Sequence, residues 1–380
     1  MDNQSYHRTL ICITGMSPQV VTETVYALAK SDKTTIETTV HIITTSIGAQ
    51  RARAVLLGGK SPKFKQLCDD YNFSHFNLQD DNIHVVKNEL GLPLADIRTH
   101  QENGAIANTI TEIIRFETNK PNCSVHVSMA GGRKTMGFYA GYAISMFGRT
   151  EDRLSHVLVS EHFENHADFF YPSKQSHMIT AHNGLLLDTS QATITLANIP
   201  FVRMRHELPT KALIHKITFS EAVDLIALAT APPSLVIDLS CRTISVAGKI
   251  LELDKVELIF YLWFIKRLIA TGEPVKRPGE FVEPDDNHPD RKQGKELVIL
   301  YTKLYGEMNV NERTRDIYIK EGMTRSLFES KRSKIKKKLE QQFGPTMASK
   351  YEIKQVGTRG NSAYTLTIAP EFITIRGGEL

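Results

Sequence analysis

Three short segments combine glycine with hydroxyl, amide and basic side chains, and each joins an apolar run to an amphipathic one. They are residues 14–19 (TGMSPQ), 46–51 (SIGAQR) and 128–135 (SMAGGRKT). If each segment opens a helix, its free N–H groups and the partial positive charge of the helix end can hold an anion. The three segments therefore predict a binding site for a phosphorylated ligand.

The segment at 128–135 carries the most charge. Gly131 and Gly132 would turn a strand into a helix, and Arg133 and Lys134 would add two full positive charges where that helix begins. Phosphate binding is one interpretation, and a tight turn with two solvated basic side chains is the other. The spacing is neither GxGxxG nor GxxxxGK[ST], which disfavours ordinary dinucleotide and P-loop binding.

In the segment at 14–19, Gly15 allows the backbone to approach a ligand closely. Ser17 is a good N-cap residue, with Pro18 in the first helical turn, so capping alone is an alternative to ligand contact for Ser17. The candidate ligand-binding residues of the three segments are Thr14, Gly15, Met16, Gln19, Ser46, Gln50, Arg51, Ala130, Gly131, Gly132 and Thr135. His162 and His166 follow a predicted strand and could reach the same place, although a surface histidine commonly has no such role.

The elements that must position these segments alternate along the first half of the chain. Apolar β-branched runs predict strands at 9–14, 39–44, 83–86, 124–128 and 155–159. Amphipathic runs predict helices at 18–29, 48–57, 105–116 and 137–147. This alternation predicts an α/β fold with a doubly wound, mostly parallel sheet covered by helices on both faces. Ligands of such sheets bind beyond the carboxyl ends of the strands, where all three segments would lie.

The second half has a different pattern. Residues 185–202 are typical of a β-hairpin or connector, and the later elements are predicted as helices at 216–230, 254–268, 296–305 and 323–343, and strands at 235–239, 242–246, 351–356 and 363–368. Residues 273–294 lack periodicity and are rich in Pro, Asp and Gly, which predicts an exposed loop. We therefore divide the chain into a domain at 1–205, a linker with a helix at 206–233, and an α+β domain at 234–380.

The composition, 41% hydrophobic and 23% charged, is typical of a soluble globular protein. No apolar run is long enough to cross a bilayer, and the first residues lack a secretory signal pattern. The cysteines are scattered without CxxC spacing, so we expect a cytoplasmic protein without structural disulfides and with buried thiols at Cys12 and Cys123. No Asp/Glu/His cluster has metal-ligand spacing, and neither a metal nor a cofactor is expected.

The run TGMSPQVVTETVYAL, taken together with SMAGGRKTMGFYAGYAISMFG, resembles the CRISPR-associated Rossmann-fold (CARF) domains, in particular those of ring nucleases. The runs HFENHADFFYP and NIPFVRMR are similar to that group as well, and the resemblance covers residues 8–205. It implies a homodimer that binds cyclic oligoadenylate across its two-fold axis. Ring nucleases of this type cleave cyclic tetra-adenylate and so switch off the antiviral signal of type III CRISPR systems.

The residues are compatible with that chemistry. An RNA ring can be cut without a metal when a ribose 2′-hydroxyl attacks the adjacent 3′-phosphate, provided that the enzyme stabilises the charge that grows on the phosphate. We assign this role to Lys134, assisted by Arg133. The resemblance places Ser17 where the family has a small hydroxyl residue that positions the scissile phosphate. No histidine is clearly a general base, which implies slow turnover.

In the second half, LVIDLSCRTISVAGKILELDKVELIFYLWFI resembles the start of response-regulator-type winged-helix domains. The run SLFESKRSKIKKKLEQQFG would be the recognition helix and YEIKQVGTRGNSAYTL the wing. Such a basic helix and wing suit contacts with DNA phosphates. The candidate DNA-binding residues are Lys334, Lys337, Lys338 and Arg359. An acidic, proline-rich insertion departs from the pattern, and a solvated basic face, a lid or a dimer element are the alternatives.

Two functions from different classes follow. In the first, the protein is a metal-independent ring nuclease that linearises cyclic tetra-adenylate. In the second, it is a DNA-binding regulator controlled by cyclic oligoadenylate. We prefer the first, because the specific resemblance lies in the N-terminal segments and no HEPN or PD-(D/E)xK nuclease motif follows them. The net charge of +4 is modest, so an argument for nucleic-acid binding must rest on where the charge lies. Duplex DNA is a possible but not favoured partner, and no membrane partner is expected.

Overall fold

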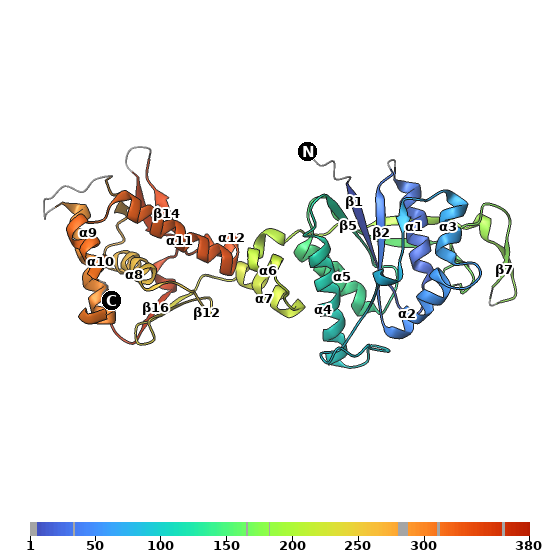
Figure 1. Cartoon of the computed structure of the whole chain (residues 1–380), viewed down its shortest axis with the longest axis horizontal. Coiled ribbons are helices and arrows are strands. Elements are labelled where there is room, and N and C mark those ends of the chain that lie inside the picture. The colour runs from blue at the N-terminus through green and yellow to red at the C-terminus, as the bar shows by residue number, and fades with distance from the viewer. Residues whose placement is uncertain are drawn as a thin grey trace. The chain divides into compact units, whose positions relative to one another are not determined.

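The computed structural model describes residues 6–32, 35–164, 166–181, 183–279, 288–309, 312–358 and 362–380 (Figure 1). The chain folds as two compact units. The first comprises residues 1–205 and 212–223, and the second comprises residues 206–211 and 224–380. No helix in the described part of the chain combines the length and apolar character needed to span a membrane.

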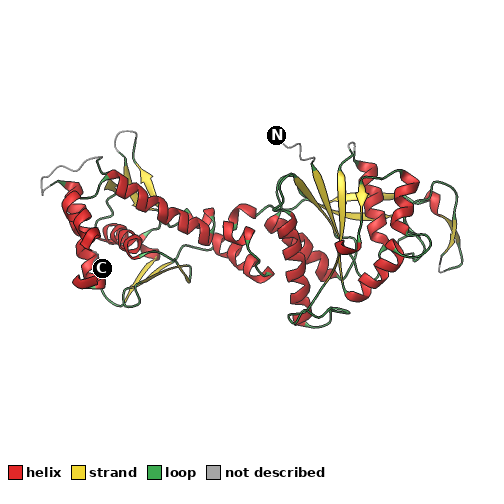
Figure 2. Ribbon diagram, viewed as in Figure 1, coloured by secondary structure: helices red, strands yellow, loops and turns green. Residues whose placement is uncertain are grey.

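A seven-stranded sheet, counted over the described residues, forms the centre of the first unit (Figure 2). Its strands are β1 (His7–Ile13), β2 (Glu37–Thr44), β3 (Phe76–Asn77), β4 (Ile83–Val85), β5 (Cys123–Ser128), β6 (Arg153–Val159) and β9 (Ile194–Asn198). The order is β3-β2-β1-β5-β6-β9, and β4 pairs with a later part of β2 than β3 does. All pairs are parallel except β6 with β9. The predicted α/β architecture with a mostly parallel sheet is confirmed.

Helices cover both faces of this sheet. Helices α1 (Gln19–Ser31) and α3 (Lys63–Tyr71) lie on one side, and α4 (His100–Glu117) and α5 (Lys134–Phe147) pack together on the other (Figure 1). Helix α2 (Ser46–Ala52) continues into a π-helical turn. The apolar residues of β1 at positions 10–13 are at most 2% exposed, as expected for a strand buried on both faces. The sequence analysis did not predict α3, although Phe64, Leu67, Cys68 and Tyr71 follow helical spacing and pack on the core.

The strand order creates a switch point between β1 and β5. From β1 the chain builds the sheet outward through β2 to β3 and β4, and then crosses over to β5 and β6 on the other side of β1. The connections that leave β1 and β5 therefore run in opposite directions, and a crevice opens between them at the carboxyl ends of the strands. The segments at 14–19 and 128–135 lie on the two sides of this crevice.

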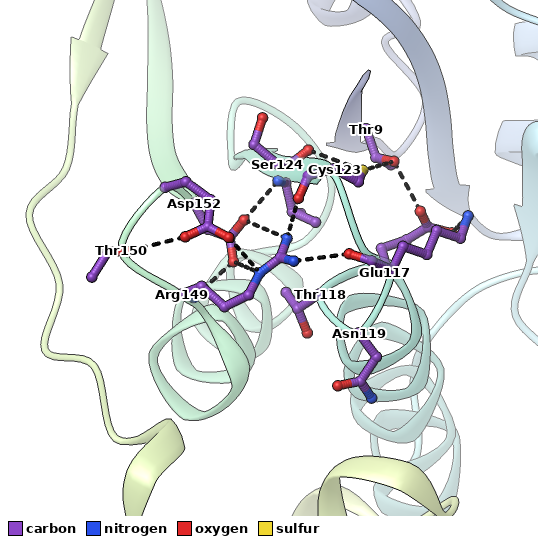
Figure 3. A network of polar contacts seen from close by, with 12 residues as sticks. Thr9, Glu117, Thr118, Asn119, Cys123, Ser124, Arg149, Thr150 and Asp152 are labelled. Carbon is purple, nitrogen blue, oxygen red and sulfur yellow. Dashed lines mark hydrogen bonds and ion pairs between the residues drawn. The ribbon is translucent and has the colours of Figure 1, made fainter. Parts of the chain in front are cut away.

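An ion-pair network ties together the other end of the sheet (Figure 3). The fully buried Asp152 carboxylate accepts hydrogen bonds from Val125 N at 2.7 Å and from the Arg149 guanidinium at 3.0 and 3.1 Å. Arg149 also donates to the carbonyl oxygens of Lys120 and Cys123, so both charges are compensated. Removing one member of such a buried pair costs about 3–5 kcal/mol, because the other charge is left unpaired.

The run NIPFVRMR contributes to the same end of the sheet. Arg203 Nε donates to the carbonyl oxygen of Arg149 at 2.7 Å, and Arg205 Nη1 donates to that of Phe147 at 2.7 Å. These arginines therefore hold the end of the first unit against its core, away from the carboxyl ends of the strands. The remaining elements of the first unit are the hairpin β7 (Met178–Thr180) and β8 (Leu186–Asp188). Residues 185–202 thus supply one strand of a hairpin and, in β9, an antiparallel edge strand of the main sheet.

The second unit contains two small sheets and a helical core. Strands β12 (Lys249–Ile250), β11 (Thr243–Val246), β10 (Leu235–Asp238) and β16 (Ile373–Arg376) form one sheet, and β13 (Val275–Lys276), β15 (Ala363–Leu366) and β14 (Ile353–Val356) form the other. The larger helices are α8 (Lys255–Ala270), α9 (Pro289–Tyr305) and α11 (Arg325–Phe343), and the shorter ones are α10 (Glu312–Asp316) and α12 (Pro345–Ala348). Along the chain, α6 (Thr210–Ile214) and α7 (Phe219–Thr230) follow β9 and precede β10.

The prediction of an exposed loop at 273–294 is wrong at both ends, where the structure has a strand and a helix. Strand β13 pairs with β15, and α9 begins at Pro289, where the His288 side chain accepts a hydrogen bond from Asp290 N. The Asp290 and Gln293 side chains are buried in the fold. A proline in the first helical turn needs no N–H partner, so a segment that looked like a loop can start a helix. The rest of the loop, at 280–287, lies outside the described residues.

Candidate functional site

A pocket of about 480 Å³ lies at the switch point, beyond the carboxyl ends of β1, β2 and β5. Its volume is within the range of small-molecule sites. The lining residues come from four segments and are Gly15, Met16, Ser17, Val20, Thr45, Ile47, Ala95, Asp96, Ile97, Arg98, Ala130, Gly131, Gly132, Arg133 and Met136. A larger depression of about 890 Å³ lies between β4, α4 and residues 216–221, and it contains none of the predicted site residues.

The three glycine-containing segments are in contact through their backbones. A Cβ atom on Gly15 would lie 3.2 Å from the Cα of Gly132, and one on Gly131 would lie 2.9 Å from the carbonyl oxygen of Ile13. A Cβ on Gly48 would lie 2.7 Å from the carbonyl oxygen of Gly15. Gly132 has φ +82°, which side-chain-bearing residues rarely adopt. The pocket floor is therefore made of main chain, so backbone N–H and C=O groups can approach a ligand.

Ser17 does not cap α1, and this prediction is wrong. The helix begins at Gln19, and Pro18 occupies the cap position with φ −69° and ψ −11° and without a side-chain hydrogen bond. Because the proline ring fixes φ near its helical value, Pro18 itself starts the turn, and its carbonyl oxygen accepts from Val21 N at 3.1 Å. No hydrogen bond from a described residue engages the Ser17 hydroxyl. Ser17 lines the pocket instead, so its hydroxyl remains free for a ligand.

Arg133 is paired across the pocket with Asp96, a residue that the sequence analysis missed. The guanidinium donates two hydrogen bonds to the Asp96 carboxylate, from Nε at 2.9 Å and from Nη2 at 2.6 Å. Arg98 Nε donates a third at 2.9 Å. These bonds, first those of Arg133 and then that of Arg98, hold the pKa of Asp96 well below its usual range. In the free pocket the charge of Arg133 is therefore compensated, and an incoming phosphate must compete with Asp96.

Lys134 and Thr135 lie at the rim of the site. Both are exposed in the first turn of α5, and neither is among the residues that line the pocket. The Lys134 ammonium makes no ion pair or hydrogen bond with the described residues. The two adjacent basic residues thus differ: Arg133 is fixed by a carboxylate, whereas the charge of Lys134 is available at the N-terminus of α5.

In and beside the segment at 46–51, the residues that line the pocket differ from the predicted ones. Thr45 caps α2, with its hydroxyl accepting from Gly48 N at 3.4 Å, and Thr45 and Ile47 line the pocket. Ser46 donates its N–H to the Leu94 carbonyl oxygen at 2.8 Å, while Gln50 and Arg51 are exposed on α2 away from the lining. Thr45 could have been found from the sequence, because a hydroxyl residue directly before a helix is a typical N-cap.

Four other predicted residues lie outside this pocket. Thr14 is fully buried, and its hydroxyl has no partner among the described residues. Gln19 is buried and faces a second, smaller pocket. His166 is buried with Nε2 3.0 Å from the Thr180 carbonyl oxygen and with Nδ1 accepting from Asp168 N at 3.1 Å, so it holds its own loop together. His162 is exposed in a turn with φ +74°.

The cysteines and acidic residues form no metal site in the described residues. Cys12 and Cys123 are buried, as predicted, and all four cysteines are free thiols. No group of three or more His, Cys, Asp or Glu side chains within the described ranges is arranged to hold a metal ion.

Three of the seven basic residues of helix α11 form ion pairs within the fold. Lys338 Nζ donates to the Glu257 carboxylate on α8 at 2.6 Å, Lys336 pairs with Glu352 at 3.0 Å, and Arg332 pairs with Glu329. Glu257 is buried, so the Lys338 pair fastens α11 to α8, and Lys338 is engaged within the fold. Lys334 and Lys337 are exposed. Arg359 lies outside the described residues.

A family comparison relates this site to known proteins. The family model described as CRISPR-associated protein NE0113 (Cas_NE0113) matches residues 17–230. This chain belongs to that family. The matched region begins at Ser17 and includes most of the pocket lining, from α1 to the segment that follows β5. A comparison with curated proteins found no match. The link to CRISPR systems that the motifs implied is therefore confirmed at the level of this NE0113 family.

The close packing of the loops in this NE0113-family chain makes a testable prediction. Gly48→Ala would place a methyl group 2.1 Å from Thr44 Oγ1 and 2.7 Å from the Gly15 carbonyl oxygen. We expect a loss of about 1–3 kcal/mol in the free energy of unfolding, measured by urea denaturation, because the backbone must shift to admit the methyl group.

The matched control is Gly104→Ala. Gly104 lies inside α4, and a Cβ there would meet no atom within 4 Å. Alanine is the better helix former, so this variant should gain up to about 1 kcal/mol. Equal stability of the Gly48 variant and the parent would contradict the close packing of the loops.

Proposed function

We propose that this protein is a ring nuclease whose first unit, a CARF domain, binds cyclic oligoadenylate and cleaves it without a metal. Cyclic tetra-adenylate is the favoured substrate, and its cleavage would switch off type III CRISPR signalling. The observation that carries the proposal is the switch-point pocket, which is lined by Ser17, with its free hydroxyl, and by Arg133, and which has the exposed Lys134 at its rim. Membership of a CRISPR-associated family supports the same conclusion.

The proposed reaction needs only groups of the ring and of this site. A ribose 2′-hydroxyl attacks the adjacent phosphorus, a bond forms between O2′ and phosphorus, and the bond from phosphorus to O5′ breaks. The products carry a 2′,3′-cyclic phosphate and a 5′-hydroxyl. Lys134, together with the N–H groups at the start of α5, would stabilise the negative charge that grows on the phosphate oxygens. Ser17 would hold the phosphate in line for attack.

Arg133 has a different part in this proposal. Its pairing with Asp96 keeps the guanidinium in one orientation beside the pocket before a ligand arrives. A phosphate that binds there would share or replace the carboxylate, and the fork of donors suits both. The pair therefore makes the pocket selective for strongly anionic ligands, because a weak acceptor would not displace Asp96.

We also propose that a homodimer binds the ring. Met16 and Ile47 line the pocket and are 50% and 43% exposed, and Leu90 and Leu92 in the loop after β4 are 83% and 58% exposed. Exposed apolar side chains of this kind are suited to an interface. A cyclic tetranucleotide has internal symmetry, so a two-fold mate would present the same loops to its opposite side.

The second unit would be a winged-helix domain in this proposal. Its elements support the resemblance, since strands β10, β11 and β12 precede α8 in the chain and the β14–β15 hairpin follows α11. With three of the seven basic residues of α11 in internal ion pairs, a lid or dimer element is better supported than a DNA-binding surface.

The first prediction concerns the metal. Because the attacking group belongs to the ring itself, purified protein should cleave cyclic tetra-adenylate in excess EDTA and give products with 2′,3′-cyclic phosphate ends. Chromatography and mass spectrometry of the products measure this. Activity that disappears in EDTA and returns with Mg²⁺ or Mn²⁺ would exclude the mechanism. Ligand-dependent binding of duplex DNA without any ring cleavage would support the regulator instead.

The second prediction concerns Lys134. Lys134→Ala should slow single-turnover cleavage at least about a hundredfold, which corresponds to roughly 2.7 kcal/mol of transition-state stabilisation. The matched control is Lys65→Ala, which removes an exposed lysine on α3 outside both pockets at the switch point. The control should cleave at the parent rate. A Lys134 variant that is as fast as the parent at saturating protein would remove this residue from the site.

The third prediction concerns stoichiometry. Titration calorimetry should give one cyclic tetra-adenylate per two chains, and light scattering should show a dimer with ligand at micromolar concentration. Replacing both Leu90 and Leu92 with serine should weaken the dimer, because the exposed apolar area that a second copy would cover is reduced. A ligand-bound monomer with one ring per chain would refute the shared site.

A further inference from the structure

A second, smaller pocket of about 80 Å³ adjoins the switch-point pocket. Ser17, Val20 and Ala130 line both of them. The lining of the small pocket also includes polar side chains, which are Gln19 and Glu23 of α1, Glu164 in the loop after β6 and His156 of β6, beside the apolar residues 157–159. Ser17 thus stands between the proposed reaction site and a group of side chains to which no role has yet been given.

Glu23 is a buried acid without a counter-ion. It is 5% exposed, and no hydrogen bond or ion pair from the described residues reaches its carboxyl group. Burial is the main cause that raises its pKa, to about 8, and the charge of Glu164 adds to the effect. Glu23 is therefore largely protonated at neutral pH. Unlike Asp96 in the neighbouring pocket, it can donate a proton.

Gln19 gives an independent sign that the small pocket holds a polar guest. Its side chain is 93% buried, since it is 7% exposed, and Nε2 donates to the Ala167 carbonyl oxygen at 3.0 Å. Its Oε1 atom is buried and has no donor among the described residues. Leaving such an acceptor unsatisfied costs about 1–3 kcal/mol. A pocket of this volume admits water, which can donate to Gln19 and bridge to its neighbours.

The sequence of α1 places these groups together. Gln19 and Glu23 are four residues apart and therefore lie on the same helix face, and Ser17 stands just before that helix. Burying a carboxyl group costs free energy that an apolar side chain of similar size would not. Packing alone therefore does not explain why Glu23 is buried beside Gln19 and Ser17, and a function does.

We propose that Glu23 supplies, through water in the small pocket and the Ser17 hydroxyl, the proton that the 5′-oxygen takes up when the ring is cut. This inference rests on the ring nuclease function proposed above. As O2′ bonds to phosphorus and the bond from phosphorus to O5′ breaks, O5′ takes the hydroxyl proton of Ser17. Water re-protonates Ser17 and is itself re-protonated by Glu23. The 2′-hydroxyl proton leaves to solvent, and Glu23 later regains a proton from solvent.

Glu23 does not touch the ring and acts only through water and Ser17, so it is a positioning residue. The test of its role must therefore include the dependence of the cleavage rate on pH. Two titratable groups face it, Glu164 and His156. Single-turnover cleavage of cyclic tetra-adenylate would be measured in EDTA between about pH 6 and pH 9 for the parent and three variants. In the parent, the rate should be lowered by loss of the Glu23 proton as the pH rises through about 8.

Glu23→Gln keeps the size and neutrality of the side chain but has no acidic proton. It should bind the ring as the parent does, cleave at least about tenfold more slowly at neutral pH, and lose the decline near pH 8. Glu164→Gln removes the charge that helps to raise the pKa of Glu23, so the decline should move to lower pH. Glu161→Gln, an exposed acid of the same loop that does not line the pocket, should have the parent profile.

The outcomes separate the two proposals. A parent that binds cyclic tetra-adenylate but never cleaves it would refute the ring nuclease function, and the proton relay with it. A parent that cleaves, together with a Glu23→Gln variant of the same rate and the same profile, would refute the relay alone. If Glu23→Gln is less stable than the parent, Glu23→Asp is the deciding variant. A Glu23→Asp variant that keeps part of the cleavage rate and still loses activity as the pH rises would support the relay. A variant whose rate no longer falls at high pH would contradict the relay.

Discussion

Contact between the main chains of three loops determines the geometry of the site. The loops after β1, β2 and β5 meet where Gly15, Gly48 and Gly131 lie, and a side chain would collide with backbone at Gly48 or Gly131 and would crowd it at Gly15. Because the strands are parallel and adjacent, their carboxyl ends bring the loops to one edge of the sheet. The absence of side chains at the contact points lets the loops close into a pocket floor made of backbone, and the charged side chains are arranged around this floor.

Electrostatic compensation differs sharply between neighbouring groups of this site. Arg133 is held by Asp96, whereas Lys134, the next residue, has no described partner. On the other side of Ser17, Glu23 is buried without a cation, which favours its protonated form. The two adjoining pockets and their rim thus offer a fixed cation, an available cation and a neutral acid. A cation is needed to stabilise negative charge on a phosphate, and a neutral acid is needed to donate a proton. Burial and ion pairing give these neighbouring side chains their different charge states.

The second unit is held by the same kind of pairing, with a different consequence. The α11 helix is rich in lysine and arginine, yet Lys338 is committed to the buried Glu257 of α8 and Lys336 to Glu352. The ion pairs fasten the helix to its own core and reduce the charge that remains for phosphates. A count of basic residues therefore overstates the capacity of this helix to bind nucleic acid.

The sequence by itself determined the alternation of strands and helices, the burial of β1 and β5, and the convergence of the loops, because these follow from local periodicity and from the geometry of parallel sheets. Only the tertiary structure decided which side chains meet. Asp96 and Arg133 are 37 positions apart, and Glu257 and Lys338 are 81 apart. No local rule relates such positions, since periodicity and capping preferences extend over a few residues. The isolation of Glu23 likewise depends on elements that pack against α1 from distant parts of the chain.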